Sequence, residues 1–165
     1  MVTRREPRGF TLIEVMLVVA ITSILASGGA VVLTQVFRFF RQTQARIEIQ
    51  RDARAVFDQI SRTLRSARAS TIVIDQLTNQ PPYSRITFTR IDGTALSYFQ
   101  NGDTLYQVSG GTKSLCGNLR YIAFSTPRTD DDNIVSISLT LEKATYNSQT
   151  KALQLSVEKV KVNND

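Results

Sequence analysis

The longest apolar run of the chain lies near its N-terminus. From Phe10 to Phe37 the only formal charge is Glu14. A helix of about 20 apolar residues crosses a bilayer core of ~30 Å, so this run is long enough to span a membrane. Aromatic residues and arginines interleave directly after it, which is typical of a membrane–water boundary. We therefore predict a transmembrane segment over residues 10–37.

Beyond this segment, apolar residues continue at helical spacing while arginines and acids fill the other positions. The stripe comprises Ala53, Val56, Phe57, Ile60, Leu64 and Ala67. The pattern predicts one helix from Phe10 to about Ala67, with residues 38–69 as its extramembrane, amphipathic half. Such a stripe more often packs on a core than binds a ligand, so we expect it to pack on a sheet.

After residue 70 the pattern changes to alternation with closely spaced turn signals, which is typical of antiparallel sheet. The predicted strands are Ser84–Ile91, Ala95–Gln100, Thr104–Val108, Leu119–Ser125, 135–142 and 153–157. Asp92-Gly93 and Asn101-Gly102 supply positive φ for tight hairpins. Apolar residues alternate at positions 153, 155 and 157, and the alternation begins again one position out of step at Val160. This suggests a bulge or strand end before Val160. We predict an α+β chain in which residues 70–165 form a β-rich globular head.

Charge is unevenly distributed along the chain, which has a net charge of +6. Residues 1–9 contribute +2 and Glu14 contributes −1. Residues 38–68 carry eight arginines against three acids, whereas nine basic and nine acidic residues follow from residue 69 onward. Because the predicted head is neutral, nucleic acid is not an expected partner. The helix arginines are either a solvated face or partners for acidic residues of adjacent subunits.

Candidate chemistry is sparse, so we predict that the chain is not an enzyme. It has no histidine, the commonest general base and metal ligand. Cys116, the single cysteine, is expected to be a structural thiol. Asp130, Asp131 and Asp132 lack the spacing of a calcium loop, and a solvated turn is the favoured reading. No catalytic, cofactor-binding or metal-binding residue is predicted.

The N-terminus has the wrong order for an ordinary secretory signal. Gly9 lies between a basic leader and the apolar run, whereas a secretory signal places its small-residue cleavage site after the apolar region. A cut at Gly9 would therefore leave the hydrophobic helix on the mature chain.

The residues RGFTLIEVMLVVAI, at positions 8–21, resemble the prepilin signature of type IV pilins and of the pseudopilins of type II secretion systems. The resemblance implies that a prepilin peptidase removes residues 1–9 by cleaving between Gly9 and Phe10, and that it methylates the new amino terminus of Phe10. It also implies a type IV pilin-like fold, with a cytoplasmic N-terminus and a periplasmic head.

Two features of the apolar run need an explanation. A carboxylate in the hydrocarbon region costs about 2.5–3.5 kcal/mol on insertion scales, and such residues usually have a partner or a function. Glu14 could pair with the freed amine of Phe10 during assembly, or it could be solvated near the membrane surface.

The second feature is the interruption of the helix pattern by Ser27, Gly28 and Gly29. These residues could let the helix bend, or could permit close approach of a neighbouring helix.

The resulting hypothesis is a structural subunit, a minor pilin or pseudopilin, of a type IV pilus or a type II secretion pseudopilus. Residues 50–68 and the following strands are similar to J-type minor pseudopilins. The implied partners are the prepilin peptidase, other pilin or pseudopilin subunits, the inner-membrane assembly platform and membrane lipid. The alternative is a membrane-anchored or fibre-tip binding module that recognises a secreted substrate, DNA or a surface.

Overall fold

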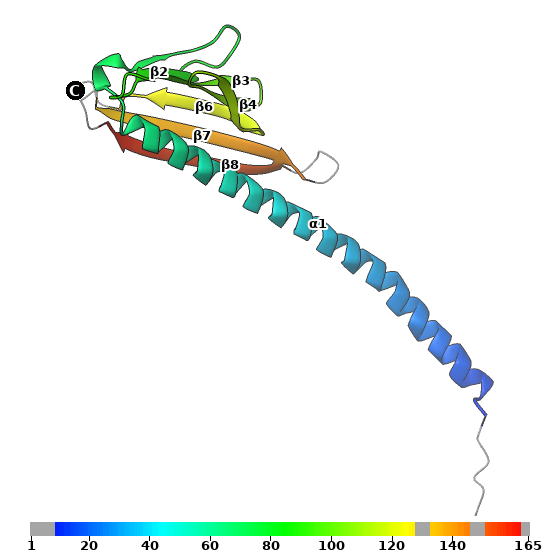
Figure 1. Ribbon diagram of the computed structural model, residues 1–165. Coiled ribbons are helices and arrows are strands. Elements are labelled where there is room, and N and C mark those ends of the chain that lie inside the picture. The colour runs from blue at the N-terminus through cyan, green and yellow to red at the C-terminus, as the bar shows by residue number, and fades with distance from the viewer. Residues whose placement is uncertain (1–8, 128–132, 146–150, 163–165) are drawn as a thin grey trace, which may run out of the picture. The chain divides into compact units, whose positions relative to one another are not determined.

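The computed structural model describes residues 9–127, 133–145 and 151–162, with the backbone alone over 151–155 (Figure 1). It divides the chain into two units, one up to Phe40 and one from Arg41 onward. A single helix, α1 (Leu12–Leu64, 53 residues), contributes to both. The predicted helix is therefore confirmed, with ends a few residues inside the predicted ones.

The helix ends before Ala67 because the following backbone pairs with a strand. Ile91 N–H donates to the carbonyl of Ser66 at 3.0 Å, and Arg68 N–H donates to the carbonyl of Thr89 at 2.9 Å. Ala67 forms an isolated antiparallel bridge with Arg90 and is fully buried. It thus belongs to the core as predicted, although it lies outside the helix. A short 3₁₀ turn, η1 (Ala69–Thr71), then leads into the sheet.

The head contains two antiparallel sheets. The five strands of the first follow chain order as a meander: β1 (Val73–Asp75), β2 (Arg85–Thr89), β3 (Ala95–Asn101), β4 (Thr104–Val108) and β5 (Thr112–Cys116). The three strands of the second also follow chain order: β6 (Leu119–Ser125), β7 (Ile134–Ala144) and β8 (Lys151–Lys161). Gly93 and Gly102 have φ of 84° and 62°, as the predicted hairpins require.

One core joins α1 to both sheets. The buried face of the helix carries Ala45, Ile49, Ala53, Val56, Phe57, Ile60 and Leu64. The inward positions of the sheets supply Ile86, Phe88, Leu96, Tyr98, Leu105, Leu119, Ile122, Phe124, Val135, Ile137, Leu139, Leu141 and Val160, and Val162 follows β8. Figure 1 shows the C-terminal part of α1 lying along β7 and β8. The predicted packing of the apolar stripe on a sheet is confirmed.

Polar contacts fix the position of the helix on the sheets. Thr63 Oγ1 and the Tyr98 hydroxyl are 2.8 Å apart and form a hydrogen bond. Burial raises the pKa of the Tyr98 phenol. Lys143 Nζ lies 2.5 Å from Glu48 Oε2. This lysine lowers the pKa of the Glu48 carboxyl through a hydrogen bond and through its charge.

The two sheets meet through the side chain of Gln100, which is 3% exposed. Its Nε2 donates to the carbonyls of Gly102, at 2.8 Å, and Arg120, at 3.3 Å. Its Oε1 accepts from the backbone N–H of Ile122 at 3.2 Å. One amide of β3 therefore satisfies two backbone groups of β6, the first strand of the second sheet.

The structure differs from the sequence predictions in two strands and in one predicted bulge. Strands β1 and β5 were not predicted. The predicted bulge or strand end before Val160 is wrong, because β7 and β8 pair in unbroken register from Ile134↔Lys161 to Ala144↔Lys151. Val157 lies on the solvent face and is 61% exposed, whereas Val160 is buried. They are three positions apart, so the regular alternation of a strand places them on opposite faces without a bulge. The acidic cluster at 130–132 lies outside the described residues.

Gln100 and Ser84 provide a matched pair of buried polar side chains. We expect Gln100→Leu to lower the free energy of unfolding by about 2 kcal/mol. The substitution leaves the Ile122 N–H and the Arg120 carbonyl without the hydrogen-bond partner that Gln100 provides. The Ser84 Oγ is buried and has no hydrogen-bond partner among the described atoms. Ser84→Ala should therefore leave stability unchanged or raise it slightly. Urea unfolding of the detergent-solubilised chain, followed by near-UV circular dichroism, measures both. Equal losses for the two variants would contradict the role given to Gln100.

Candidate functional site

The candidate processing site lies immediately before α1. Gly9 and Phe10 precede the first helical residue, Leu12, and both are exposed, with Phe10 87% accessible. No helix or sheet hydrogen bond engages the Gly9–Phe10 bond among the described residues. The peptide bond at which cleavage is predicted is therefore open to a processing enzyme. The leader before it lies outside the described residues.

Glu14 takes part in a capping box at the start of α1. The backbone N–H and the hydroxyl of Thr11 donate to Glu14 Oε2 at 2.9 and 3.0 Å. The Glu14 N–H points back to Thr11 Oγ1 at 3.4 Å. Thr11 is therefore the N-cap, and the T-x-x-E spacing satisfies helix-terminal donors reciprocally. The T-x-x-E spacing from Thr11 to Glu14 is present in the sequence and predicts this cap.

Apolar side chains surround α1 from its first turn to Phe40. None of the membrane-length stretch is buried inside the chain, and the helix is long and apolar enough to cross a bilayer. Its exposed large side chains are Leu12, Ile13, Val15, Met16, Leu17, Val18, Val19, Ile21, Ile24, Leu25, Val31, Val32, Leu33, Val36, Phe37, Phe39 and Phe40. A surface of this extent requires an apolar environment outside the chain, such as lipid or other helices.

The hydroxyl groups within this stretch bond to their own helix. Ser23 Oγ donates to the Val19 carbonyl at 2.7 Å, and Thr34 Oγ1 donates to the Val31 carbonyl at 2.7 Å. Thr22 and Ser27 do the same. Each hydroxyl is thus satisfied without water, as an apolar environment demands.

The helix passes through Gly28 and Gly29 without a break. A Cβ added at either glycine would meet nothing within 4 Å in this chain. Packing within the chain therefore does not require these glycines. Bending and close approach of a neighbouring helix both remain as hypotheses for their role.

The surroundings of the Cys116 thiol disfavour its reactive, ionised form. Cys116 is buried, and burial together with the charge of Asp52 raises its pKa to about 11. Its thiolate is therefore scarce near neutral pH, as expected for a structural thiol. Among the residues that the structure describes, no three His, Cys, Asp or Glu side chains gather as a metal site.

Comparison with known proteins adds one finding. Residues 4–30 match the prokaryotic N-terminal methylation motif. This match includes Gly9, Phe10, Thr11, Glu14 and most of the exposed apolar helix. No curated protein and no solved structure matches the chain. The comparisons therefore characterise only the N-terminal segment, whereas the fold of the head is known from the structure alone.

The capping box predicts a local effect at the start of α1. We expect Thr11→Ala to speed amide hydrogen exchange in the first helical turn about fivefold, because a lost N-cap costs roughly 1 kcal/mol. Ser23→Ala is the control, since its hydroxyl bonds only to a helix carbonyl. Exchange would be measured by mass spectrometry on the protein in dodecyl maltoside micelles. Unchanged exchange in Thr11→Ala would contradict the capping role.

Proposed function

We infer from this motif, the N-terminal signature of type IV pilins and pseudopilins, that the chain is a prepilin peptidase substrate and a structural subunit of a filament. We propose that it is a minor pilin or pseudopilin of a type IV pilus or a type II secretion pseudopilus. One observation carries the proposal: the motif continues directly into an apolar helical surface that none of the described residues cover.

The proposed sequence of events begins in the membrane. The apolar stretch holds the subunit in the inner membrane with its N-terminus in the cytoplasm and its head in the periplasm. Prepilin peptidase cuts after Gly9 and methylates Phe10. The assembly platform then moves the subunit into a filament, where helices of other subunits replace lipid around the apolar surface. The role is structural rather than catalytic.

Glu14 would act after processing. Both Thr11 contacts end on Oε2, and neither uses Oε1. That second oxygen can accept a hydrogen bond from the amine of Phe10, in the same or a neighbouring subunit. The capping box fixes the carboxylate at the end of the helix, and an ion pair in apolar surroundings is strong enough to favour one axial register.

An observation on the head favours the second candidate, a fibre-tip binding module. Phe99 and Tyr106 stack on the sheet face opposite the core, with ring centroids 5.6 Å apart. Tyr83 is 61% exposed, and its φ of 60° is uncommon for a bulky residue. Aromatic residues of this kind are enriched at protein interfaces. A secreted protein substrate suits this neutral surface better than DNA does.

Processing can be tested by intact-mass analysis and N-terminal sequencing of the protein from membranes. We expect a mature chain beginning with N-methylated Phe10 in cells that contain prepilin peptidase, and a chain beginning at Met1 in cells that lack it. Gly9→Leu is the matched variant and should keep its leader in both. An uncut leader in the presence of the peptidase would overturn the proposal.

Assembly can be tested separately with Glu14→Ala. We expect normal processing but at least about tenfold less subunit in sheared filaments, because the ion pair with the Phe10 amine is lost. Thr11→Ala is the control: it removes the cap and keeps the carboxylate, so it should assemble far better. Wild-type assembly of Glu14→Ala would contradict the ion pair. Equal defects in both variants would assign Glu14 to capping instead.

A further inference from the structure

Two exposed arginines of α1, Arg41 and Arg46, have no acidic partner in the part of the chain that the structure describes. No acidic residue occurs in the sequence between Glu14 and Glu48. Glu48 is itself engaged, since its Oε2 lies 2.5 Å from Lys143 Nζ. The positive charge at this end of the extramembrane helix therefore has no counter-charge among the described residues.

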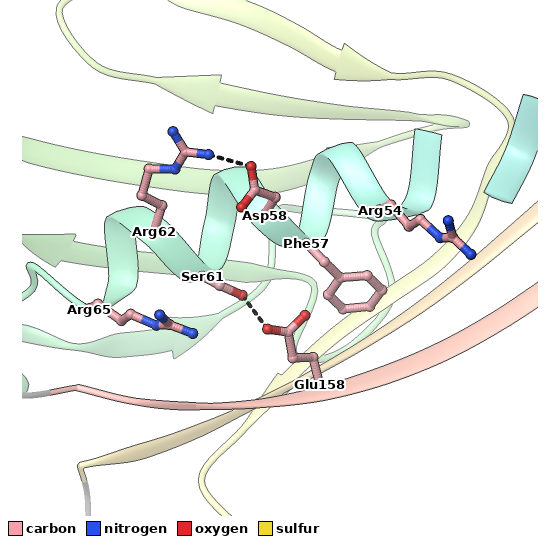
Figure 2. Close-up of a pocket in the computed structure, with 7 residues that line it drawn as sticks. All are labelled: Arg54, Phe57, Asp58, Ser61, Arg62, Arg65 and Glu158. Carbon is pink, nitrogen blue, oxygen red and sulfur yellow. Dashed lines mark hydrogen bonds and ion pairs between the residues drawn. The ribbon is translucent and has the colours of Figure 1, made fainter. Parts of the chain in front are cut away.

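Arginines farther along α1 are in a different situation. Figure 2 shows a groove in which three arginines share their surroundings with two acids: Arg54, Arg62 and Arg65 with Asp58 and Glu158. Arg62 pairs with Asp58 one helical turn away. Acids of the same chain thus offset part of the charge in this groove. The first two arginines of the extramembrane helix are the ones whose charge complements an external anion.

The positions of these two arginines in α1 place them just beyond the membrane-length stretch. The last large apolar side chains of that stretch are Phe37, Phe39 and Phe40, which are 59% to 71% exposed. Arg41 follows directly, and Arg46 lies about 9 Å beyond Phe40 at a rise of 1.5 Å per residue. Side chains of a helix tilt toward its N-terminus, and an arginine stem can lie along apolar surface while its guanidinium stays in a polar layer. Both guanidinium groups can therefore reach back toward the headgroup layer, which is roughly 5–8 Å thick.

The anion present at that depth is the phosphate of a lipid. A carboxylate of another protein would have to enter the headgroup layer to reach it, whereas lipid phosphates form that layer. A guanidinium group binds phosphate through two parallel hydrogen bonds. A lipid such as phosphatidylcholine carries a cation that offsets its phosphate, whereas phosphatidylglycerol has a net negative charge. The chemistry therefore favours an anionic phospholipid.

We propose that Arg41 and Arg46 bind the phosphate groups of anionic phospholipids and so fix the depth of α1 in the membrane. Arg38 has an interaction within the chain and is not assigned to this site. Each arginine near an anionic surface contributes about a fivefold effect on binding. Two such contacts set the depth of the helix but leave the subunit able to depart for a filament. That α1 lies in a bilayer rests on the proposed function.

The test uses the full-length chain with Phe40→Trp, reconstituted in lipid vesicles. The chain has no tryptophan of its own, so indole fluorescence reports on this position alone. Quenching by brominated phosphatidylglycerol, compared with brominated phosphatidylcholine, gives the relative affinity for the two lipids. We expect phosphatidylglycerol to be preferred at least about fivefold at low salt, and the preference to fall when salt is raised. Adding Arg41→Gln/Arg46→Gln should make the two lipids quench equally.

The controls ask whether charge at these two positions is responsible. Lysine at positions 41 and 46 should retain most of the preference. Arg54→Gln should behave as the parent, because Arg54 is exposed but lies roughly 21 Å beyond Phe40, more than two Debye lengths at physiological salt. Inorganic phosphate should leave the preference unchanged. A preference abolished by millimolar phosphate would assign the arginines to free phosphate and overturn the lipid assignment.

The outcomes separate this inference from the proposed function. Equal quenching by both lipids in the parent, or an undiminished preference in the double glutamine variant, would overturn the inference. If processing at Gly9 and the Glu14 dependence of assembly persist in that case, only the lipid contact falls. Failure of the chain to insert into either vesicle would overturn the membrane placement and the lipid contact together.

Discussion

The distribution of apolar side chains around α1 is the constraint on which the rest of this structure depends. Up to Phe40 they surround the helix, and from Ala45 onward they occupy one face. A helix that is apolar all round must be buried in a protein core or in a membrane, and none of this stretch is buried within the described chain. The second arrangement is what a sheet requires of a covering helix. A single helix is therefore suited to two environments, an apolar one up to Phe40 and a sheet from Ala45 onward. The change from one to the other occurs where the arginines of the helix begin.

The features of the fold that could be predicted are those in which local pattern and tertiary packing agree. The helix, strand β6 and the turns at Gly93 and Gly102 each follow from periodicity or from required positive φ. Strand β5 was missed because Thr112, Lys113 and Ser114 are exposed and polar. Strand β1 has three residues and too little sequence to show alternation. Both are edges whose pairing with a neighbouring strand, rather than their own pattern, makes them strands.

For the candidate site, too, local motifs and long-range contacts differ in what sequence can predict. The prediction of cleavage at the Gly9–Phe10 bond uses only the order of basic, small and apolar residues. The cap made by Thr11 uses a short motif that sequence also contains. The contact between Ser61 and Glu158 could not be found in this way, because the two residues meet only after the second sheet has folded against the helix. Long-range placement of this kind has no signal in a single sequence.

A filament subunit of the proposed kind would have two separate requirements, cohesion and the choice of partner, and they call for surfaces of different chemistry. Apolar packing around the N-terminal half of α1 supplies cohesion, but it is nearly independent of which apolar partner is present. Specificity requires groups that penalise a wrong neighbour, and paired charges do this because a mismatch leaves a charge without a counterion. In the proposed assembly, Glu14 is the charge that would do so. We therefore expect cohesion to reside in the apolar half of the helix and the choice of axial register to depend on Glu14.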